Sequence, residues 1–320
     1  YKRYNNSIKM KKIIKIILLL TLTSLMNAID VKANEKIKIG LLVPLTGKNS
    51  EIGQSIIKSV RLAINKINNP LIEIIPKDTK SNAKITLEVA KELATSGIKI
   101  IIGPVFNENL IHLNKLNEIT FLALTNKNNN FSKNIINAGI NSTSQLNAIK
   151  KFIKLNKIKK TIFLTPDLAF KHEIEEAISN SKIKILKNYI YDTDPTKLTK
   201  QIEKITQYKI RKQNLEDEII RLEKSNQANK ERLIERLKKR DTLGGVNFDS
   251  IVISDFDESL KSVTTSLLYT DISPKKKYFI TLNQWFDESL LMETSSQPLY
   301  FPSANKSNYD DFSSEYYKKY

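Results

Sequence analysis

A glycine followed by a lysine, Gly47-Lys48, stands directly after a short apolar run, where a phosphate-binding loop could lie. In such a loop the glycine backbone and the lysine cradle the phosphates, and the next hydroxyl holds magnesium. Here the preceding glycine is Gly40, at the wrong spacing, and Asn49 replaces the hydroxyl residue. The glycine-rich signatures of dinucleotide-binding proteins and of serine hydrolases do not occur either. The sequence therefore gives no sign of nucleotide or hydrolase chemistry.

Residues that could hold a metal or act as a nucleophile are equally sparse. The chain has no cysteine, which excludes a disulfide, a thiolate metal site, a cysteine nucleophile and a lipid-anchoring cysteine. Its two histidines, His112 and His172, lie in amphipathic stretches and are predicted to be surface or boundary residues. Asp255, Asp257 and Glu258 cluster after an apolar run and could bind a cation, although acidic residues that open a helix explain them better. We expect no metal, no cofactor and no enzymatic activity.

The elements that must position any site are short apolar runs that alternate with amphipathic stretches. Unbroken apolar runs are typical of strands covered on both faces, and the stretches between them carry apolar residues at helical spacing. This alternation predicts an α/β protein with a parallel sheet. The first predicted strands are Ile37 to Val43, Leu71 to Ile75, Ile98 to Ile102 and Phe121 to Leu124.

A second series of the same kind follows, with predicted strands at Thr161 to Leu164, Ile183 to Ile190, Phe248 to Ile253 and Tyr278 to Leu282. The sequence therefore predicts two doubly wound parallel-sheet lobes with a cleft between them, and a seam near Gly139 to Ser144. We assign residues 34–140 to lobe 1, 141–301 to lobe 2 and 302–320 to a return into lobe 1. A helical pattern continues to the last residue, so we expect further elements of lobe 1 to be missing.

A charged stretch without glycine, Thr196 to Arg240, interrupts the second series. Leu215, Ile219 and Leu222 follow the spacing of a narrow helical seam, and Leu233 and Leu237 resume it after five uncharged residues. The pattern predicts a helical arm, 196–240, that projects from lobe 2. A hairpin that turns at 226–229 and one long solvated helix fit the pattern equally well.

Candidate ligand-binding residues follow from position, because ligands of open parallel sheets lie beyond the carboxyl ends of the strands. Two such edges that face each other across a hinge can close around a small polar molecule, such as an amino acid or amide. Trp285, the sole tryptophan, either covers this cleft or packs between the lobes. The candidates are Thr46, Gly47, Phe106, Asn107, Thr125, Asn126, Phe170, Phe256, Asn283 and Trp285.

The N-terminal part resembles a targeting segment. Lys11 and Lys12 precede an apolar run, Ile13 to Met26, and Val31-Lys32-Ala33 offers small residues to a signal peptidase. We expect residues 1–33 to comprise a cleaved signal peptide and an upstream extension, because Met10 fits an initiator. The mature chain is then periplasmic, with no stable membrane insertion. The formal net charge of +18 is spread over all segments and lacks interleaved aromatic residues, so we expect no nucleic-acid partner.

Several motifs resemble the type I periplasmic binding proteins of the leucine-binding-protein superfamily. The Gly-Pro-x-Phe ending of one motif, the Gly-Gln pair and the exit of the arm are most similar to penicillin-binding protein activators. The resemblance covers residues 37–320, and its motifs are Leu41 to Gly47, Gly53-Gln54, Leu62 to Asn65, Asp78-Thr79, Ile101 to Phe106, Leu237 to Gly244, Phe248 to Val252 and Asn283 to Asp287.

This resemblance implies a binding protein, and two functions fit it. The first is an accessory that docks on a peptidoglycan synthase, with the arm as a contact surface. The second is the receptor of an ABC permease for amino acids or amides. In amino-acid-binding relatives a hydroxyl residue holds the ligand carboxylate and an acid holds its ammonium, whereas Asn107 and Asn283 or Gln284 stand at these positions here. That difference weakens the case for a free amino acid as the ligand.

Overall fold

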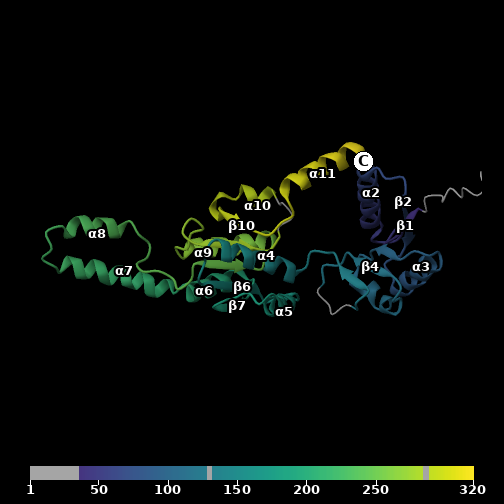
Figure 1. Ribbon diagram of the computed structural model, residues 1–320. Helices are drawn as coiled ribbons and strands as arrows, with labels where there is room; N and C mark the ends of the chain where they lie inside the picture. The colour runs from purple at the N-terminus through teal and green to yellow at the C-terminus, as the bar shows by residue number, and fades with distance from the viewer. Residues whose placement is uncertain (1–35, 128–131, 284–287) are drawn as a thin grey trace, which may run out of the picture.

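The computed structural model describes residues 36–127, 132–283 and 288–320. Within these ranges the chain forms two α/β lobes, each built on a five-stranded parallel sheet (Figure 1). The strand orders are β2-β1-β3-β4-β5 in lobe 1 and β10-β9-β8-β6-β7 in lobe 2. In each sheet the chain runs first to one edge strand and then back across the sheet to the other, so helices cover both faces. The predicted fold class is confirmed.

Lobe 1 contains the first five strands, and its connections include two short 3-10 helices, η1 and η2. Its elements are β1 (Ile37–Val43), α2 (Ser50–Ile67), β2 (Ile72–Asp78), α3 (Ala83–Thr95), β3 (Ile100–Ile102), η1 (Asn107–Leu110), η2 (Leu113–Lys115), β4 (Thr120–Ala123) and β5 (Ile135–Asn137).

Lobe 2 contains the other five strands and most of the helices, and one further helix, α11, follows it. These elements are α4 (Ser142–Leu155), β6 (Thr161–Pro166), α5 (Lys171–Ser181), β7 (Lys187–Tyr191), α6 (Pro195–Ile205), α7 (Tyr208–Glu223), α8 (Lys230–Lys238), β8 (Ser250–Ile253), α9 (Asp257–Tyr269), β9 (Tyr278–Thr281), α10 (Glu288–Met292), η3 (Thr294–Ser296), β10 (Leu299–Tyr300) and α11 (Lys306–Lys319).

The strands of lobe 2 feed two cores because successive side chains point to opposite faces of the sheet. Ile162 and Leu164 of β6 pack with helices α6 and α9, whereas Phe163 packs with α4 and α5. In β8, Ile251 and Val252 divide in the same way. Because both faces of these strands are buried, their centres are unbroken apolar runs, Ile162 to Leu164 and Ile251 to Ile253, and the flanking Thr161, Thr165 and Ser250 are buried polar residues.

The projecting arm begins later than the sequence suggested. We predicted an arm from Thr196, but α6 belongs to lobe 2, because Leu198 and Ile202 are 1% and 0% exposed and pack in the core beside α9. Asp194 caps α6, accepting a hydrogen bond from the Thr196 amide, and Pro195 opens it. The apolar face of α6 is narrow and lies among charged residues, so the sequence pattern does not mark it as part of a core.

Helices α7 and α8 form a hairpin, which is one of the two predicted alternatives, and not one long helix. Figure 1 shows the hairpin reaching away from both sheets. Leu215, Leu222 and Leu237 are buried against one another between the two helices. The hairpin therefore has a small core of its own, which it shares with none of the strands.

A buried arginine fixes the base of the hairpin to lobe 2. Arg211, 4% exposed, donates hydrogen bonds to the Thr206 carbonyl and to the Thr242 hydroxyl, both over 2.9 Å, and to the Thr270 carbonyl. Burial lowers the pKa of Arg211, and the charge of Asp271 acts against that shift. Because these acceptors lie on both sides of the hairpin base, Arg211 holds the hairpin at a defined angle.

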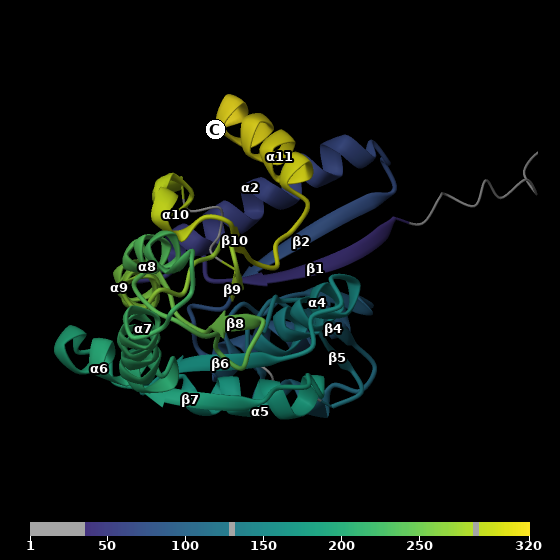
Figure 2. The same ribbon diagram turned by 90° about the vertical axis from the view of Figure 1, so that its left-hand side faces the viewer.

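Helix α11 follows lobe 2 and lies beside α2 of lobe 1 (Figure 2). An ion pair of 3.6 Å joins Lys66 to Glu315, and the Lys58 ammonium lies 5.3 Å from the centre of the Tyr320 ring. None of the helices in the described ranges is long and apolar enough to cross a membrane. The proposed targeting segment, 1–33, lies outside the described residues.

Candidate functional site

The loops after β1 and β2 are tied together at the carboxyl edge of the lobe 1 sheet. The Thr46 hydroxyl and the Leu45 amide donate hydrogen bonds to the Asp78 carboxylate over 2.6 and 2.8 Å. Burial acts to raise the pKa of Asp78, but these bonds and those from the Thr46 and Lys80 amides outweigh it and hold the pKa below its ordinary value. Gly47 follows at a φ of 81°, which glycine tolerates. Thr46 thus holds the loop, and both Thr46 and Gly47 are exposed.

The loops after β3 and β4 contribute less to a ligand surface than predicted. Phe106 and Asn107 are half-buried, and Asn107 opens η1. Thr125 is only 3% exposed, and its hydroxyl accepts a hydrogen bond from the Lys127 amide over 3.1 Å. Gly139 packs on Thr125 so closely that a Cβ there would lie 2.0 Å from the Thr125 carbonyl oxygen. Thr125 therefore shapes the backbone at the edge of lobe 1 instead of facing an open cleft.

A cavity of about 240 Å³ lies where the two lobes meet, and we call it the junction cavity. Lobe 1 contributes the loops after β4 and β5, and lobe 2 contributes α4, α5 and the loops after β6, β8 and β9. Four of the predicted site residues line it, namely Asn126, Phe170, Phe256 and Asn283. The other lining residues are Lys127, Ile140, Ser142, Gln145, Glu173, Ile174 and Leu282.

An ion pair links the two lobes across this cavity. The Lys127 ammonium of lobe 1 lies 2.7 Å from the Glu173 carboxylate on α5, and the Ser142 hydroxyl donates to the other oxygen of Glu173 over 2.7 Å. The Gln145 side-chain oxygen accepts a hydrogen bond from the backbone amide of Asn283 over 2.8 Å. The Lys127 ammonium and the Glu173 carboxylate thus satisfy each other and link the two lobes.

The apolar part of the lining includes an aromatic pair. The rings of Phe170 and Phe256 meet edge to face, with centroids 6.1 Å apart. Together with the amides of Asn126 and Asn283, this pair forms a surface that can bind a small molecule with polar and apolar parts.

The acidic residue at the end of β8 is buried beneath this surface. Asp255, 3% exposed, accepts hydrogen bonds from the Tyr191 hydroxyl, from the Ser259 hydroxyl over 2.6 Å and from the Phe256 amide over 2.9 Å. Burial, aided by the Asp255 charge, raises the pKa of Tyr191, so the phenol stays protonated and donates. Asp257 opens α9, as the helix-opening interpretation predicted. No group of three potential metal ligands is present among the described residues.

The structure therefore gathers four of the ten predicted site residues in one cavity and leaves others apart. Thr46, Gly47, Phe106 and Asn107 do not line it, and Trp285 lies outside the described residues. Four further lining residues were not among the predicted ones, namely Lys127, Ser142, Gln145 and Glu173. Three of these lie on α4 and α5, whose amino ends face lobe 1. The run of polar residues at the predicted seam could have indicated the two on α4.

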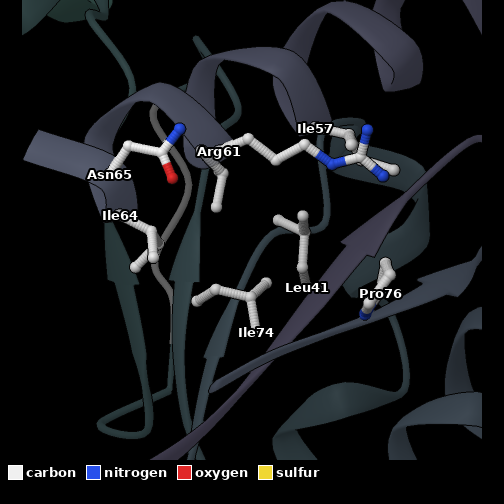
Figure 3. Close-up of a pocket in the computed structure, with 8 residues that line it drawn as sticks. Leu41, Ile57, Arg61, Ile64, Asn65, Ile74 and Pro76 are labelled. Atoms are coloured by element: carbon white, nitrogen blue, oxygen red, sulfur yellow. The ribbon is translucent and has the colours of Figure 1, made fainter. Parts of the chain in front are cut away.

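Another hollow, of about 220 Å³, lies between α2 and the lobe 1 sheet and holds none of the predicted site residues. Figure 3 shows Leu41 and Ile74 on its sheet side, and Arg61 and Asn65 on its helix side. Its lining is mostly apolar, and of α2 only Gly53 is buried. A side chain at Gly53 would collide with the Pro44 carbonyl, so this glycine lets α2 approach the sheet.

Comparisons with known proteins agree with this architecture. Residues 36–210, more than half of the chain, match the family model described as periplasmic binding protein. The solved C-domain of LpoA from Haemophilus influenzae, a regulator of PBP1A, superposes with a TM-score of 0.51 at 15% identity, over 77% of this chain and 65% of that domain. Full-length LpoA superposes with a TM-score of 0.53 at 13% identity, over 78% of this chain and 39% of LpoA.

A transport protein shares the fold to the same degree. The periplasmic ligand-binding protein of a branched-chain amino acid ABC transporter from Burkholderia xenovorans superposes with a TM-score of 0.54 at 12% identity, over 89% of this chain and 72% of that protein. No curated protein matches the sequence. The chain thus spans about two thirds of the LpoA C-domain and less than half of full-length LpoA, and at these identities the likeness concerns the fold.

Proposed function

Because the chain belongs to the periplasmic binding protein family, we propose that it is an exported, non-enzymatic binding protein that serves as an accessory of peptidoglycan synthesis, similar to penicillin-binding protein activators. Its fold likeness to the C-domain of LpoA, a regulator of PBP1A, supports this function. The partner in this proposal is a peptidoglycan synthase.

The observation that carries the proposal is that the charged groups in and near the junction cavity are already bonded to one another or to neighbouring residues. A receptor for a free amino acid needs groups that are free to bind a carboxylate and an ammonium. Here Glu173 is already bonded to Lys127 and Ser142, and Asp255 is buried in hydrogen bonds with Tyr191 and its neighbours. To bind a zwitterion, the cavity must first break a contact that joins its lobes, and this cost favours a protein whose lobes stay in place.

The hairpin of α7 and α8 is the second feature that supports an accessory role. It has its own core and is anchored by Arg211, yet none of its residues lines the junction cavity. An element that is rigid and far from the ligand surface suits contact with another protein.

We further propose that the mature chain acts in the periplasm. The apolar run of residues 13–26, preceded by Lys11 and Lys12, supports this. Fractionation of cells tests it, since the processed protein is expected in the periplasmic fraction. Recovery in washed membranes without a partner contradicts it.

The alternative function is that of a receptor for an ABC permease. The aromatic pair of Phe170 and Phe256, with Asn126 and Asn283 beside it, favours this candidate because it offers a small polar ligand both stacking and amide contacts. An amino acid or an amide would be the ligand.

Calorimetric titration of the purified protein against a panel of amino acids and amides separates the two functions. The accessory role predicts no saturable heat, or only millimolar binding. Micromolar binding of one ligand that is lost in the Phe256→Ala variant would favour the receptor instead. Phe312→Ala, on the surface of α11, is the matched control, and it is expected to leave any such binding unchanged.

A further inference from the structure

Arginine is concentrated in one short segment of this chain. The sequence contains 52 lysines and arginines, of which only seven are arginine, and five of these seven lie between Arg211 and Arg240. Elsewhere lysine carries all but two of the positive side-chain charges. Arginine differs from lysine in its planar fork of donors, which binds carboxylates through two parallel hydrogen bonds. The segment that forms the hairpin therefore uses a property that lysine does not supply.

Two of the five arginines have partners within the protein. Arg211 anchors the base of the hairpin, and Arg221 donates two hydrogen bonds of 2.7 Å to Glu218. The other three, Arg232, Arg236 and Arg240, are exposed. Among the described residues, none of their guanidinium groups forms a hydrogen bond or an ion pair. We call these three residues the arginine group.

The hairpin presents the arginine group on a rigid support. Arg232 and Arg236 are four residues apart on α8, so their Cα atoms lie about 6 Å apart along the helix axis. Arg240 follows two residues beyond the end of the helix. On its other side α8 packs Leu237 against α7, and Arg211 fixes the base of the hairpin. The backbone that carries the arginine group therefore loses little conformational freedom on binding.

We propose that the arginine group is a docking surface for a partner protein that presents carboxylates about one helical turn apart, as Glu or Asp four residues apart on a helix would do. The proposal rests on the proposed accessory role only in that the partner is a protein. It requires nothing of the junction cavity.

The surroundings of the arginine group favour a protein over a uniform polyanion. Acidic residues of α7, among them Glu216, Asp217 and Glu223, stand on the same hairpin and repel a surface that is negative throughout. Residues 212–240 contain no aromatic side chain on which a base could stack. The turn at 225–229 has no large apolar residue that could enter a bilayer. A partner with patterned charge fits these features.

The probe that tests this surface is a fluorescein-labelled, alanine-rich helical peptide with glutamates at positions i, i+4 and i+8. Its fluorescence anisotropy is followed while the whole protein is added. Replacing Arg232, Arg236 and Arg240 together by glutamine is expected to weaken binding about tenfold, since each exposed ion pair contributes about 0.2–1 kcal/mol. Replacing the three by lysine keeps the charge but loses the fork, and is expected to weaken binding about threefold.

A matched triple variant controls for net charge. Lys151→Gln, Lys154→Gln and Lys184→Gln remove three exposed charges from another part of lobe 2, and this variant is expected to change the affinity less than twofold. An equal loss in both triple variants would overturn the proposal, because net charge alone would then explain the binding. Full affinity in the lysine variant, or no binding of the peptide to the unaltered protein, would overturn it too.

Two further probes distinguish a protein partner from other anions. Vesicles of phosphatidylglycerol and inorganic polyphosphate are expected to bind more weakly than the peptide, and to be insensitive to the lysine replacement. Tighter binding of either one through the arginine group would replace the protein partner by a polyanion. Because no synthase is present in this assay, peptide binding without any effect on a synthase contradicts the proposed function and leaves the docking surface standing.

Discussion

Removing the arm at two different boundaries separates the residues that build lobe 2 from those that build only the hairpin. Leu198 and Ile202 of α6 are 1% and 0% exposed in the core beside α9. Truncation of one buried Leu or Ile to alanine costs about 2–5 kcal/mol. Removal of both, with the rest of α6, therefore approaches the whole stability of a domain, about 5–15 kcal/mol. Replacement of residues 196–240 by a Gly/Ser linker is expected to unfold lobe 2.

Replacement of residues 212–240 alone is expected to leave lobe 2 folded. The leucines lost in this variant, Leu215, Leu222 and Leu237, pack in the separate core of the hairpin. The Leu243 amide donates a hydrogen bond of 2.9 Å to the Arg211 carbonyl, so the two ends to be joined already lie together. A linker of about three glycines closes this gap at little entropic cost.

Thermal unfolding followed by far-ultraviolet circular dichroism compares the two deletions. The shorter deletion is expected to keep a cooperative transition within about 4 °C of the unaltered protein, a shift that corresponds to roughly 1–2 kcal/mol. The longer deletion is expected to abolish the transition of lobe 2. Loss of cooperativity in the shorter deletion, or its survival in the longer one, would refute the boundary drawn between α6 and α7.

Three further predictions concern single residues, each measured by thermal unfolding. Arg211→Met is expected to cost about 3 kcal/mol because it leaves buried carbonyls without donors. The control, Arg221→Met on the exposed face, is expected to cost under about 0.5 kcal/mol, and equal effects would contradict the anchoring role of Arg211. Gly139→Ala is expected to cost about 2–3 kcal/mol because its Cβ would lie 2.0 Å from the Thr125 carbonyl oxygen. The control is Gly245→Ala, whose Cβ would meet nothing within 4 Å, and a neutral Gly139→Ala would show that the seam is loosely packed. Because the pKa of Asp78 is lowered in the folded protein, its contribution to the free energy of unfolding is present above the ordinary pKa of 3.8 and is lost as the pH falls through the folded pKa. Asp78→Asn is expected to reduce stability at pH 7 and to weaken the dependence of stability on acid pH, and an unchanged dependence would contradict this.

The alternation of apolar runs and amphipathic stretches was enough to predict four strands of each sheet but not the short edge strands β5 and β10. The strands near 161 and 251 each contain an unbroken run of three apolar residues because each faces two cores, and these runs leave a strong signal in the sequence. Helix α6 was misassigned because Leu198 and Ile202 alone mark its buried face among charged residues. Burial of a narrow face depends on the tertiary partner, here α9, which local sequence does not reveal.

The candidate site was predicted in part. Phe170 and Phe256 line the junction cavity, as their positions after strands suggested. Thr46 and Thr125 hold their own loops by hydrogen bonds to Asp78 and Lys127, and sequence does not show whether a hydroxyl binds a backbone or a ligand. The contact between Lys127 and Glu173 joins residues 46 positions apart across two lobes, and only the arrangement of the lobes reveals it.

The central claim, that this binding protein acts on a peptidoglycan synthase, is tested most directly by the cross-linking rate of a purified bifunctional synthase from the same organism. Addition of the protein is expected to raise the rate severalfold. The variant that lacks residues 212–240 is expected to fold but to lose most of this effect, and Phe256→Ala is expected to retain it. An unchanged rate with the unaltered protein at saturating concentration would contradict the account.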